Sequence, residues 1–344
     1  MSRIPALGAL RALFLTPDGR TALPVRESRH WLRFIIPIFS MVFLITPLQA
    51  DMIVGDANTG NIIDYNQQTG AINWSVNDGS SHVYSLAVGP DGLIYYTTNN
   101  TVGRINPVTG ANLGTFATLG IADLAIGLAF GPNGNLFVGQ YSSGNVVQFN
   151  GKTGALMGVF AQGNGITYAG AIAFSPQGNL IVASHGSSQV LSFNGATGAF
   201  IGSIGGTVGT PLGLAFNSAG NLFVTSPGEG VLEFNGNTGA SEGTFVTITP
   251  PLVGYALAFN PNGGNLFVTS GSEVLQYDGV TGANDGVFVQ GGPLNLATSI
   301  VFTASVPEPS SFLLVGIILV VVGIGAGWGR RRSRIPIGGI QLTP

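Results

Sequence analysis

One pattern recurs six times along this chain, about every 43 residues, and this periodicity constrains the fold more than any other feature. Its core is a short apolar segment that reads Leu-Ala-Phe in the clearest copies. Self-similarity at such a period is typical of solenoids, propellers and other repeat architectures. The first residue of the segment is, in order along the chain, Leu86, Leu128, Ile172, Leu214, Leu257 and Ile300.

A second marker recurs at the same spacing. Each copy contains a Thr-Gly pair, and turn-forming residues of this kind allow a tight reversal of the backbone. Two independent markers with one period indicate true structural repeats. The pairs are Thr69-Gly70, Thr109-Gly110, Thr153-Gly154, Thr197-Gly198, Thr238-Gly239 and Thr281-Gly282.

Each unit contains four short β-rich runs separated by turn signals. In the third unit, Pro132-Asn133-Gly134 joins the first two runs and residues 150–154 join the last two. Asn-Gly between apolar runs is a strong hairpin signal. Four antiparallel strands in about 40–45 residues describe a propeller blade. The predicted strands of this unit are 127–130, 136–140, 146–150 and 155–161.

The first and last copies are incomplete in complementary ways. The first unit starts at its second strand, 52–55, continues with 61–65 and 71–76, and lacks the Leu-Ala-Phe strand. The last unit ends with an additional strand of that type, 298–302. Pairing the two completes a sixth blade and leaves no free strand edge at the seam. We therefore predict an all-β, six-bladed β-propeller over residues 51–305, closed by a C-terminal inner strand.

The repeats resemble those of NHL-type six-bladed propellers in the apolar strand, the Pro-Asn-Gly turn, the Asn-Leu-Phe-Val run and the Val-x-x-Phe-Asn run. The basic residue often found before the third strand of such repeats is replaced by Asn145-Val146 and Gln189-Val190. This difference argues against the RNA-binding branch of that family.

Charge is distributed very unevenly. Six of the 12 Lys and Arg lie in residues 1–33 and four in 330–334, which leaves Arg104 and Lys152 between them. Twelve carboxylates from Asp51 to Asp285 against these two cations give the central body a formal charge of −10. An acidic body repels phosphate backbones, so we expect no nucleic-acid partner.

The N-terminus has the features of a secretory signal peptide over residues 1–50. A basic region is followed by an apolar run, 34–48, and by Gln49-Ala50 before the polar Asp51. This order of basic, apolar and small residues is typical of a cleaved signal. An uncleaved anchor helix is the alternative; Pro37 and Pro47 and the shortness of the run favour cleavage after Ala50.

The C-terminus combines three features in order. Pro307-Glu308-Pro309 precedes an apolar stretch, 312–328, and Arg330, Arg331 and Arg332 follow. Seventeen apolar residues are near the lower limit for a transmembrane helix, and the arginines would hold its end in the cytoplasm.

This end, 306–334, resembles the PEP-CTERM sorting signal. The resemblance implies recognition by an exosortase, a membrane protease-transpeptidase of bacteria that make exopolysaccharide. It further implies export through the inner membrane, a transient membrane anchor and a final place at the cell surface or outside the cell. The tail 335–344 departs from the family pattern, which usually stops soon after the basic cluster. A plain C-terminal anchor that is never cut is the alternative.

Residues able to carry chemistry are sparse. Outside the signal region there are two histidines, His82 and His185, each expected in a solvated loop, and there is no cysteine. The short acidic loop Asp56–Asn61 lacks the closing bidentate carboxylate of a calcium site. Turn capping by Asp and Asn accounts for it. We therefore predict no catalytic residue, no metal and no cofactor.

The loops that differ between copies fall on one face of the predicted ring, and rigid scaffolds carry binding diversity in such loops. Aromatic residues there suit saccharide or peptide surfaces. The alternative is that these loops vary without binding any ligand. The candidate binding residues are Tyr84, Tyr141, Tyr168, His185 and Tyr255.

These observations favour an exported, non-catalytic binding or scaffold protein that engages exopolysaccharide or a surface protein. The alternative is a metal-dependent propeller lyase or lactonase acting outside the cell. The two make different predictions for the central channel. An empty channel lined by Ser, Thr and Gly would favour the scaffold, whereas three or more His, Asp, Glu or Asn side chains gathered at one point would favour the enzyme.

Overall fold

The computed structural model describes residues 51–80, 82–120, 123–248 and 254–303. The predicted signal peptide, the sorting motif Pro307-Glu308-Pro309, the apolar stretch 312–328, the arginines 330–332 and the tail 335–344 lie outside these residues. Within the described ranges, no helix combines the length and apolarity needed to cross a membrane.

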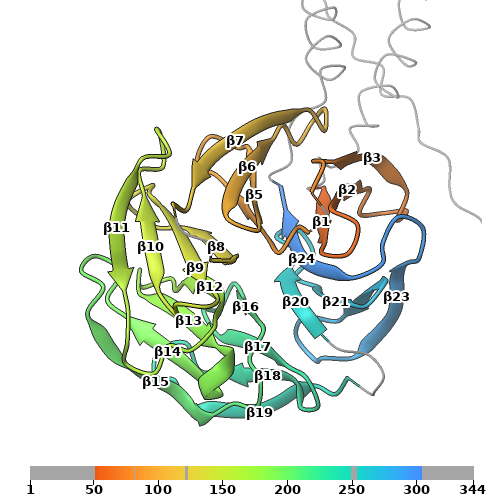
Figure 1. Cartoon of the computed structure of the whole chain (residues 1–344). Coiled ribbons are helices and arrows are strands. Elements are labelled where there is room, and N and C mark those ends of the chain that lie inside the picture. Colours follow the sequence, from red (N-terminus) through yellow and green to blue (C-terminus); the bar gives the residue numbers. More distant parts are fainter. Residues whose placement is uncertain (1–50, 81, 121–122, 249–253, 304–344) are drawn as a thin grey trace, which may run out of the picture. The chain divides into compact units, whose positions relative to one another are not determined.

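In these ranges the chain forms 24 strands, arranged as six four-stranded antiparallel sheets around a central axis (Figure 1). The first sheet has the spatial order β24 (Ala297–Phe302), β1 (Met52–Asp56), β2 (Asn61–Tyr65) and β3 (Ile72–Asn77). The second contains β4 (Ser85–Val88), β5 (Ile94–Thr98), β6 (Thr101–Ile105) and β7 (Asn112–Thr118). The third contains β8 (Ala125–Phe130), β9 (Leu136–Gln140), β10 (Val146–Phe149) and β11 (Leu156–Ala161).

The other three sheets follow the same plan, with their strands in sequence order from the axis outwards. The fourth contains β12 (Ala169–Phe174), β13 (Leu180–Ser184), β14 (Gln189–Phe193) and β15 (Phe200–Thr207). The fifth contains β16 (Gly213–Phe216), β17 (Leu222–Ser226), β18 (Gly230–Phe234) and β19 (Ser241–Val246). The sixth contains β20 (Gly254–Phe259), β21 (Leu266–Ser270), β22 (Glu273–Tyr277) and β23 (Asn284–Gln290).

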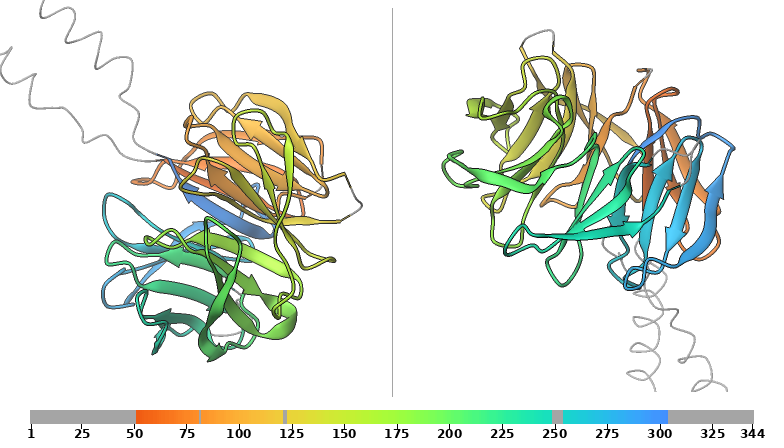
Figure 2. Two further views of the ribbon diagram at one scale, coloured as in Figure 1. Left: turned by 90° about the vertical axis from the view of Figure 1, so that its left-hand side faces the viewer. Right: turned by 90° about the horizontal axis from the view of Figure 1, so that it is seen from below.

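The six inner strands form a complete circuit. In ring order β4, β8, β12, β16, β20 and β24 each contact the next, and β24 contacts β4 (Figures 1 and 2). In the first sheet, β24 from the C-terminal end of the ring pairs antiparallel with β1, with Ile300 opposite Val54 and Phe302 opposite Met52. The ring is therefore a six-bladed β-propeller in which one blade joins both ends of the repeat region.

The core lies between neighbouring sheets. The second strand of every sheet is buried along all five of its residues. At the interface between the third and fourth sheets, Phe137 contacts Phe160 and Phe174 edge-to-face, with ring centroids 4.7 and 4.9 Å apart. Edge-to-face packing is a favourable geometry for aromatic rings. Equivalent trios are Tyr95–Phe116–Phe130, Phe223–Phe245–Phe259 and Phe267–Phe288–Phe302.

The Thr-Gly marker belongs to the turn between the third and fourth strands of each blade. The Asn150 side-chain oxygen accepts the backbone N–H groups of Lys152 and Thr153, both at 3.0 Å. Gly154 then adopts φ +71°, and a Cβ there would collide with the carbonyl oxygen of Phe116 in the neighbouring blade. The marker therefore serves both turn formation and blade packing. The equivalent capping residues are Asn66, Asn106, Asn194, Asn235 and Asp278.

Asp56 connects the two ends of the ring. It is completely buried, and its carboxylate accepts the N–H groups of Asn58 and Thr59 at 2.9 and 2.8 Å. The same carboxylate accepts the N–H groups of Asn295 and Leu296, at the entry to β24, at 2.6 and 2.7 Å. Asp56 thus caps its own turn, as the sequence predicts, and also ties β1 to the segment that precedes β24.

We predict that Asp56→Ala lowers the free energy of unfolding by about 3 kcal/mol, because several charge-assisted hydrogen bonds are lost and buried N–H groups are left unpaired. Denaturant unfolding of the purified chain measures the change. Asp285→Ala removes an exposed carboxylate and is the control, expected to change stability by less than about 0.5 kcal/mol. Equal stability of the two variants would contradict a role for Asp56 in closing the ring.

A second buried carboxylate lies in the first sheet. Asp64 on β2 is 2% exposed; its Oδ2 accepts a hydrogen bond from the Asn73 amide at 3.1 Å, and among the described residues its buried Oδ1 has no hydrogen-bond partner. Burial, together with the charge of Asp51, raises the pKa of Asp64 to about 7, against the opposing effect of the Asn73 hydrogen bond. The folded protein therefore binds a proton here that the unfolded chain releases near pH 4.

The sign of this shift gives a pH prediction. Stability falls as pH rises from about 4 through 7, because ionising Asp64 in the folded state is unfavourable. Asp64→Asn removes the ionisation, so its melting temperature should decrease less than that of the wild type between pH 5 and pH 8.5. Asp278→Asn is the control: it introduces the asparagine that the other five turns have at this position. Its melting temperature should change with pH as that of the wild type does. Parallel curves for all three proteins would refute the assignment.

Candidate functional site

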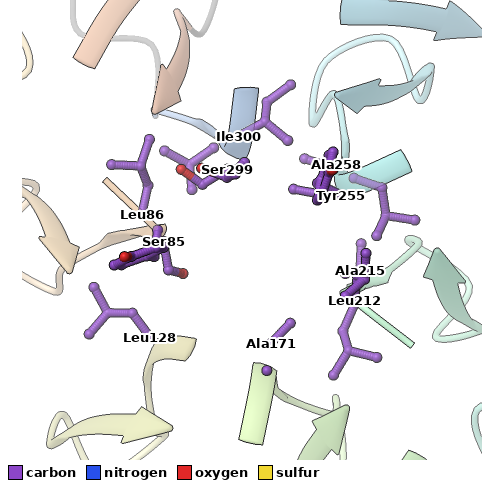
Figure 3. A pocket seen from close by; sticks show the side chains of 18 of the residues that line it. Ser85, Leu86, Leu128, Ala171, Leu212, Ala215, Tyr255, Ala258, Ser299 and Ile300 are labelled. Carbon is purple, nitrogen blue, oxygen red and sulfur yellow. The ribbon is translucent and has the colours of Figure 1, made fainter. Parts of the chain in front are cut away.

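A cavity of about 660 Å³ lies along the axis of the ring, surrounded by the inner strands (Figure 3). The equivalent aliphatic residue of all six copies lines it, from Leu86 through Ile300. Five of these six side chains are at most 6% exposed, so they pack mainly between blades and present only an edge to the axis. The repeat that builds the ring therefore also makes the middle of the cavity apolar.

Small residues on either side of this aliphatic position keep the cavity open. The preceding residue is Ser, Gly or Ala in every copy, and the following residue is Ala in five copies and Val in one. Ala171, Ala215 and Ala258 are among those that face the cavity (Figure 3). The inner strands thus read small-aliphatic-small, a signal present in the sequence that we did not use to predict a cavity.

The two ends of the cavity differ in chemistry. Tyr84 and Tyr255 lie where inner strands begin, and Tyr141 and His185 lie in the turns between second and third strands, which belong to the same face. The opposite end is formed where inner strands finish and is apolar: Val88, Phe216, Phe259 and Phe302. We call the first end the aromatic mouth, defined by Tyr84, Tyr141, His185 and Tyr255.

The structure thus brings four of the five predicted binding residues to one opening. The fifth, Tyr168, stacks on Tyr141 with ring centroids 4.5 Å apart and an interplanar angle of 13°, and it lies 6.5 Å from the ring of His185. Tyr168 is 41% exposed and has φ +55°, a left-handed conformation that is costly for a bulky residue. Stacking and backbone contacts hold it in this conformation.

Hydrogen bonds fix the backbone of the mouth. The buried carboxylate of Asp123 accepts the N–H groups of Ser142 and Ser143 at 2.7 and 2.9 Å, and Tyr141 donates its N–H to Leu124 O at 3.0 Å. Burial raises the pKa of Asp123, but the hydrogen bonds from Ser143 and Ser142 outweigh it and leave the pKa below its ordinary value. The carboxylate therefore stays ionised and holds the Tyr141 loop.

Similar hydrogen bonds hold the segments near His185 and Tyr255. The hydroxyl of Ser184 accepts the Thr167 N–H at 2.8 Å, next to Tyr168 and His185. The hydroxyl of Thr225 donates to Tyr255 O at 3.3 Å. A buried polar residue ends the second strand of every blade, a recurrence that we did not recognise in the sequence: Asp56, Thr98, Gln140, Ser184, Ser226 and Ser270.

The sequence predicts that both histidines are solvated loop residues, but each makes contacts within the protein. His185 begins a short 3-10 helix, His185–Ser187, is only partly exposed and lines the cavity. His82 stacks on Tyr84 with ring centroids 5.6 Å apart. Among the residues that the structure describes, no three His, Asp or Glu side chains come close enough together to hold a metal ion.

The lining of the cavity differs from both expectations for the channel. Ser85, Thr298 and Ser299 line it, but most of its wall is Leu, Ile, Val, Ala and Phe. The Ser/Thr/Gly lining that would favour a scaffold is therefore not found, because the aliphatic residues that hold the blades together extend to the axis. An apolar cavity with a few polar groups at its opening has the usual character of a small-molecule site.

Comparison with known proteins bears on the fold alone. No family model matches the sequence, and no match was found among curated proteins. Among solved structures, the ring is similar to a protein of unknown function from Bacteroides caccae, with TM-score 0.61 and 17% identity over 74% of this chain and 99% of that one. It is similar to a chain of a nidogen/laminin complex, with TM-score 0.61 and 16% identity over 74% and 99%. At these identities the likeness shows a shared six-bladed propeller.

Proposed function

We propose that this chain is an exported, non-catalytic binding protein that presents the aromatic mouth of its propeller outside the cell. The observation that supports binding is the convergence of Tyr84, Tyr141, His185 and Tyr255 on the opening of one cavity. These side chains come from four different sheets, and hydrogen bonds hold the segments that carry them. Such preorganisation lowers the entropy lost when a ligand is bound.

The proposal of export rests on the two ends of the sequence. The basic and apolar N-terminal region and the Pro307-Glu308-Pro309 motif with its apolar and arginine-rich continuation support secretion followed by exosortase-type sorting. On this proposal the chain crosses the inner membrane, is anchored there transiently and is then released to the cell surface or the matrix. Its partners are the sorting protease and, at the mouth, exopolysaccharide or a surface protein.

We predict that the double variant Tyr84→Ala/Tyr255→Ala retains matrix components at least tenfold less well than the wild type, since aromatic anchors carry much of the energy of such contacts. A pull-down from exopolysaccharide-rich matrix and a glycan array measure the retention. Phe200→Ala is the matched control, because Phe200 is 42% exposed on the outer strand β15, away from the mouth. Unchanged retention by the double variant would contradict binding at the mouth.

Sorting gives a separate prediction. In a host with an exosortase, the wild type should appear outside the inner membrane, starting at Asp51 and lacking its arginine-rich end. Replacement of Pro307, Glu308 and Pro309 by alanine should leave the protein in the membrane fraction. Pro336→Ala in the tail is the control and should be processed normally. Cell fractionation with intact mass measurement distinguishes these outcomes, and identical processing of all three proteins would refute the sorting signal.

A further inference from the structure

We propose that the cavity binds a single-chain amphiphile, with its alkyl chain along the axis and an uncharged polar head at the aromatic mouth. The inference rests on the proposed function, because it assigns a ligand class to the same site. It begins from the uneven distribution of polar groups along the cavity. The described residues that line it include seven with polar side chains: Tyr84, Ser85, Tyr141, His185, Tyr255, Thr298 and Ser299.

Four of these seven form the aromatic mouth, Ser85 follows Tyr84 at the start of β4, and Thr298 and Ser299 are turned into the protein. The Thr298 hydroxyl donates to Val83 O at 2.7 Å. The Ser299 side chain is 5% exposed, and its oxygen occupies the space that a Cβ on Gly55 would need. Apart from Ser85, Thr298 and the buried Ser299 hydroxyl, the side chains that line the cavity beyond the mouth are therefore apolar. A sugar, a peptide backbone or an ion placed there would lose its hydrogen bonds to water without replacement.

The size of the cavity fits a small molecule. Its volume of about 660 Å³ lies within the range of about 300–1,000 Å³ usual for small-ligand sites. Apolar protein cavities are poorly hydrated and bind apolar molecules. An alkyl chain would contact the aliphatic residues of all six copies at once, and its polar end would reach the tyrosines and His185.

The charge of the ring argues against an anionic head. In residues 51–303 the basic side chains, apart from histidine, are Arg104 and Lys152. Lys152 lies in the turn between β10 and β11, which belongs to the face opposite the mouth. Arg104 lies near the end of β6 that approaches that opposite face, with its guanidinium 5.1 Å from the ring of Phe116. With twelve carboxylates in the same residues, the field at the mouth disfavours a negative head.

The test is a titration series with the full-length chain. Hexyl, heptyl, octyl and nonyl glucoside, each below its micelle concentration, are followed by isothermal titration calorimetry. The dissociation constant should fall about fourfold for each added methylene, as expected for burial of one methylene group. Octanoate, with a negative head, should bind at least tenfold more weakly than octyl glucoside. An affinity independent of chain length would overturn the assignment.

Variants that fill the cavity separate specific binding from adsorption. Ala215→Leu/Ala258→Leu places added side chains in the cavity and should weaken octyl glucoside binding at least tenfold. Ala171→Leu acts from another blade and serves if the double variant fails to fold, which its melting curve reveals. Ala196→Leu on an exposed turn is the control and should bind as the wild type does. If folded variants with a filled cavity bind octyl glucoside as tightly as the wild type, the detergent binds elsewhere on the chain. That result would refute the proposal.

The outcome can be separated from that of the proposed function. If the Tyr84→Ala/Tyr255→Ala variant loses matrix retention while alkyl glucosides do not bind in the cavity, the mouth is a binding site and the amphiphile is the wrong ligand class. If chain-length dependence and the effect of the filling variants are both seen, the cavity holds the alkyl chain, whether or not a glycan binds at the mouth.

Discussion

Pairing of β24 with β1 is the contact on which the rest of this structure depends. Each inner strand contacts the next around the ring, so every blade is packed on both sides once this single non-local pair has formed. The pair joins residues about 250 positions apart, and Asp56 strengthens it by binding the N–H groups of Asn295 and Leu296. A closed ring leaves no inner strand without a neighbour, and it fixes the positions of the loops that surround the axis.

The architecture could be predicted from the sequence because each repeat contains two independent markers of the blade. Leu-Ala-Phe marks the inner strand and Thr-Gly marks the outer hairpin, so the number of copies gives the number of blades. The boundaries were less accurate: the inner strand of the third sheet starts at Ala125 rather than at residue 127, because an irregularity between Ala125 and Gly127 lengthens the pairing with β9. Such irregularities depend on the twist of the sheet and have no clear sequence signal.

The candidate site could be predicted only in part. The variable loops identified the face and the aromatic residues, but not that Tyr84, Tyr141, His185 and Tyr255 share one opening, since this depends on how blades are placed around the ring. The apolar lining of the channel matches neither of the two linings that we set out for a scaffold and an enzyme. Strand periodicity tells which residues are buried, but it does not tell whether a buried aliphatic side chain also reaches the axis, as Leu128 and Ile300 do.

The cavity is apolar because each inner strand has two roles in the ring. The inner strand packs against both neighbouring blades and also borders the axis, so an aliphatic residue that seals the blade interface also reaches the cavity. Six strands around an axis leave a space there, and small residues on both sides of the aliphatic position in five of the six strands prevent it from being filled. Ring geometry therefore provides the space, and the packing requirement of the blades makes it apolar. The polar residues with large side chains lie at or just outside the strand ends of one face: Tyr84, Tyr141 and His185 flank strands, and Tyr255 is the second residue of β20.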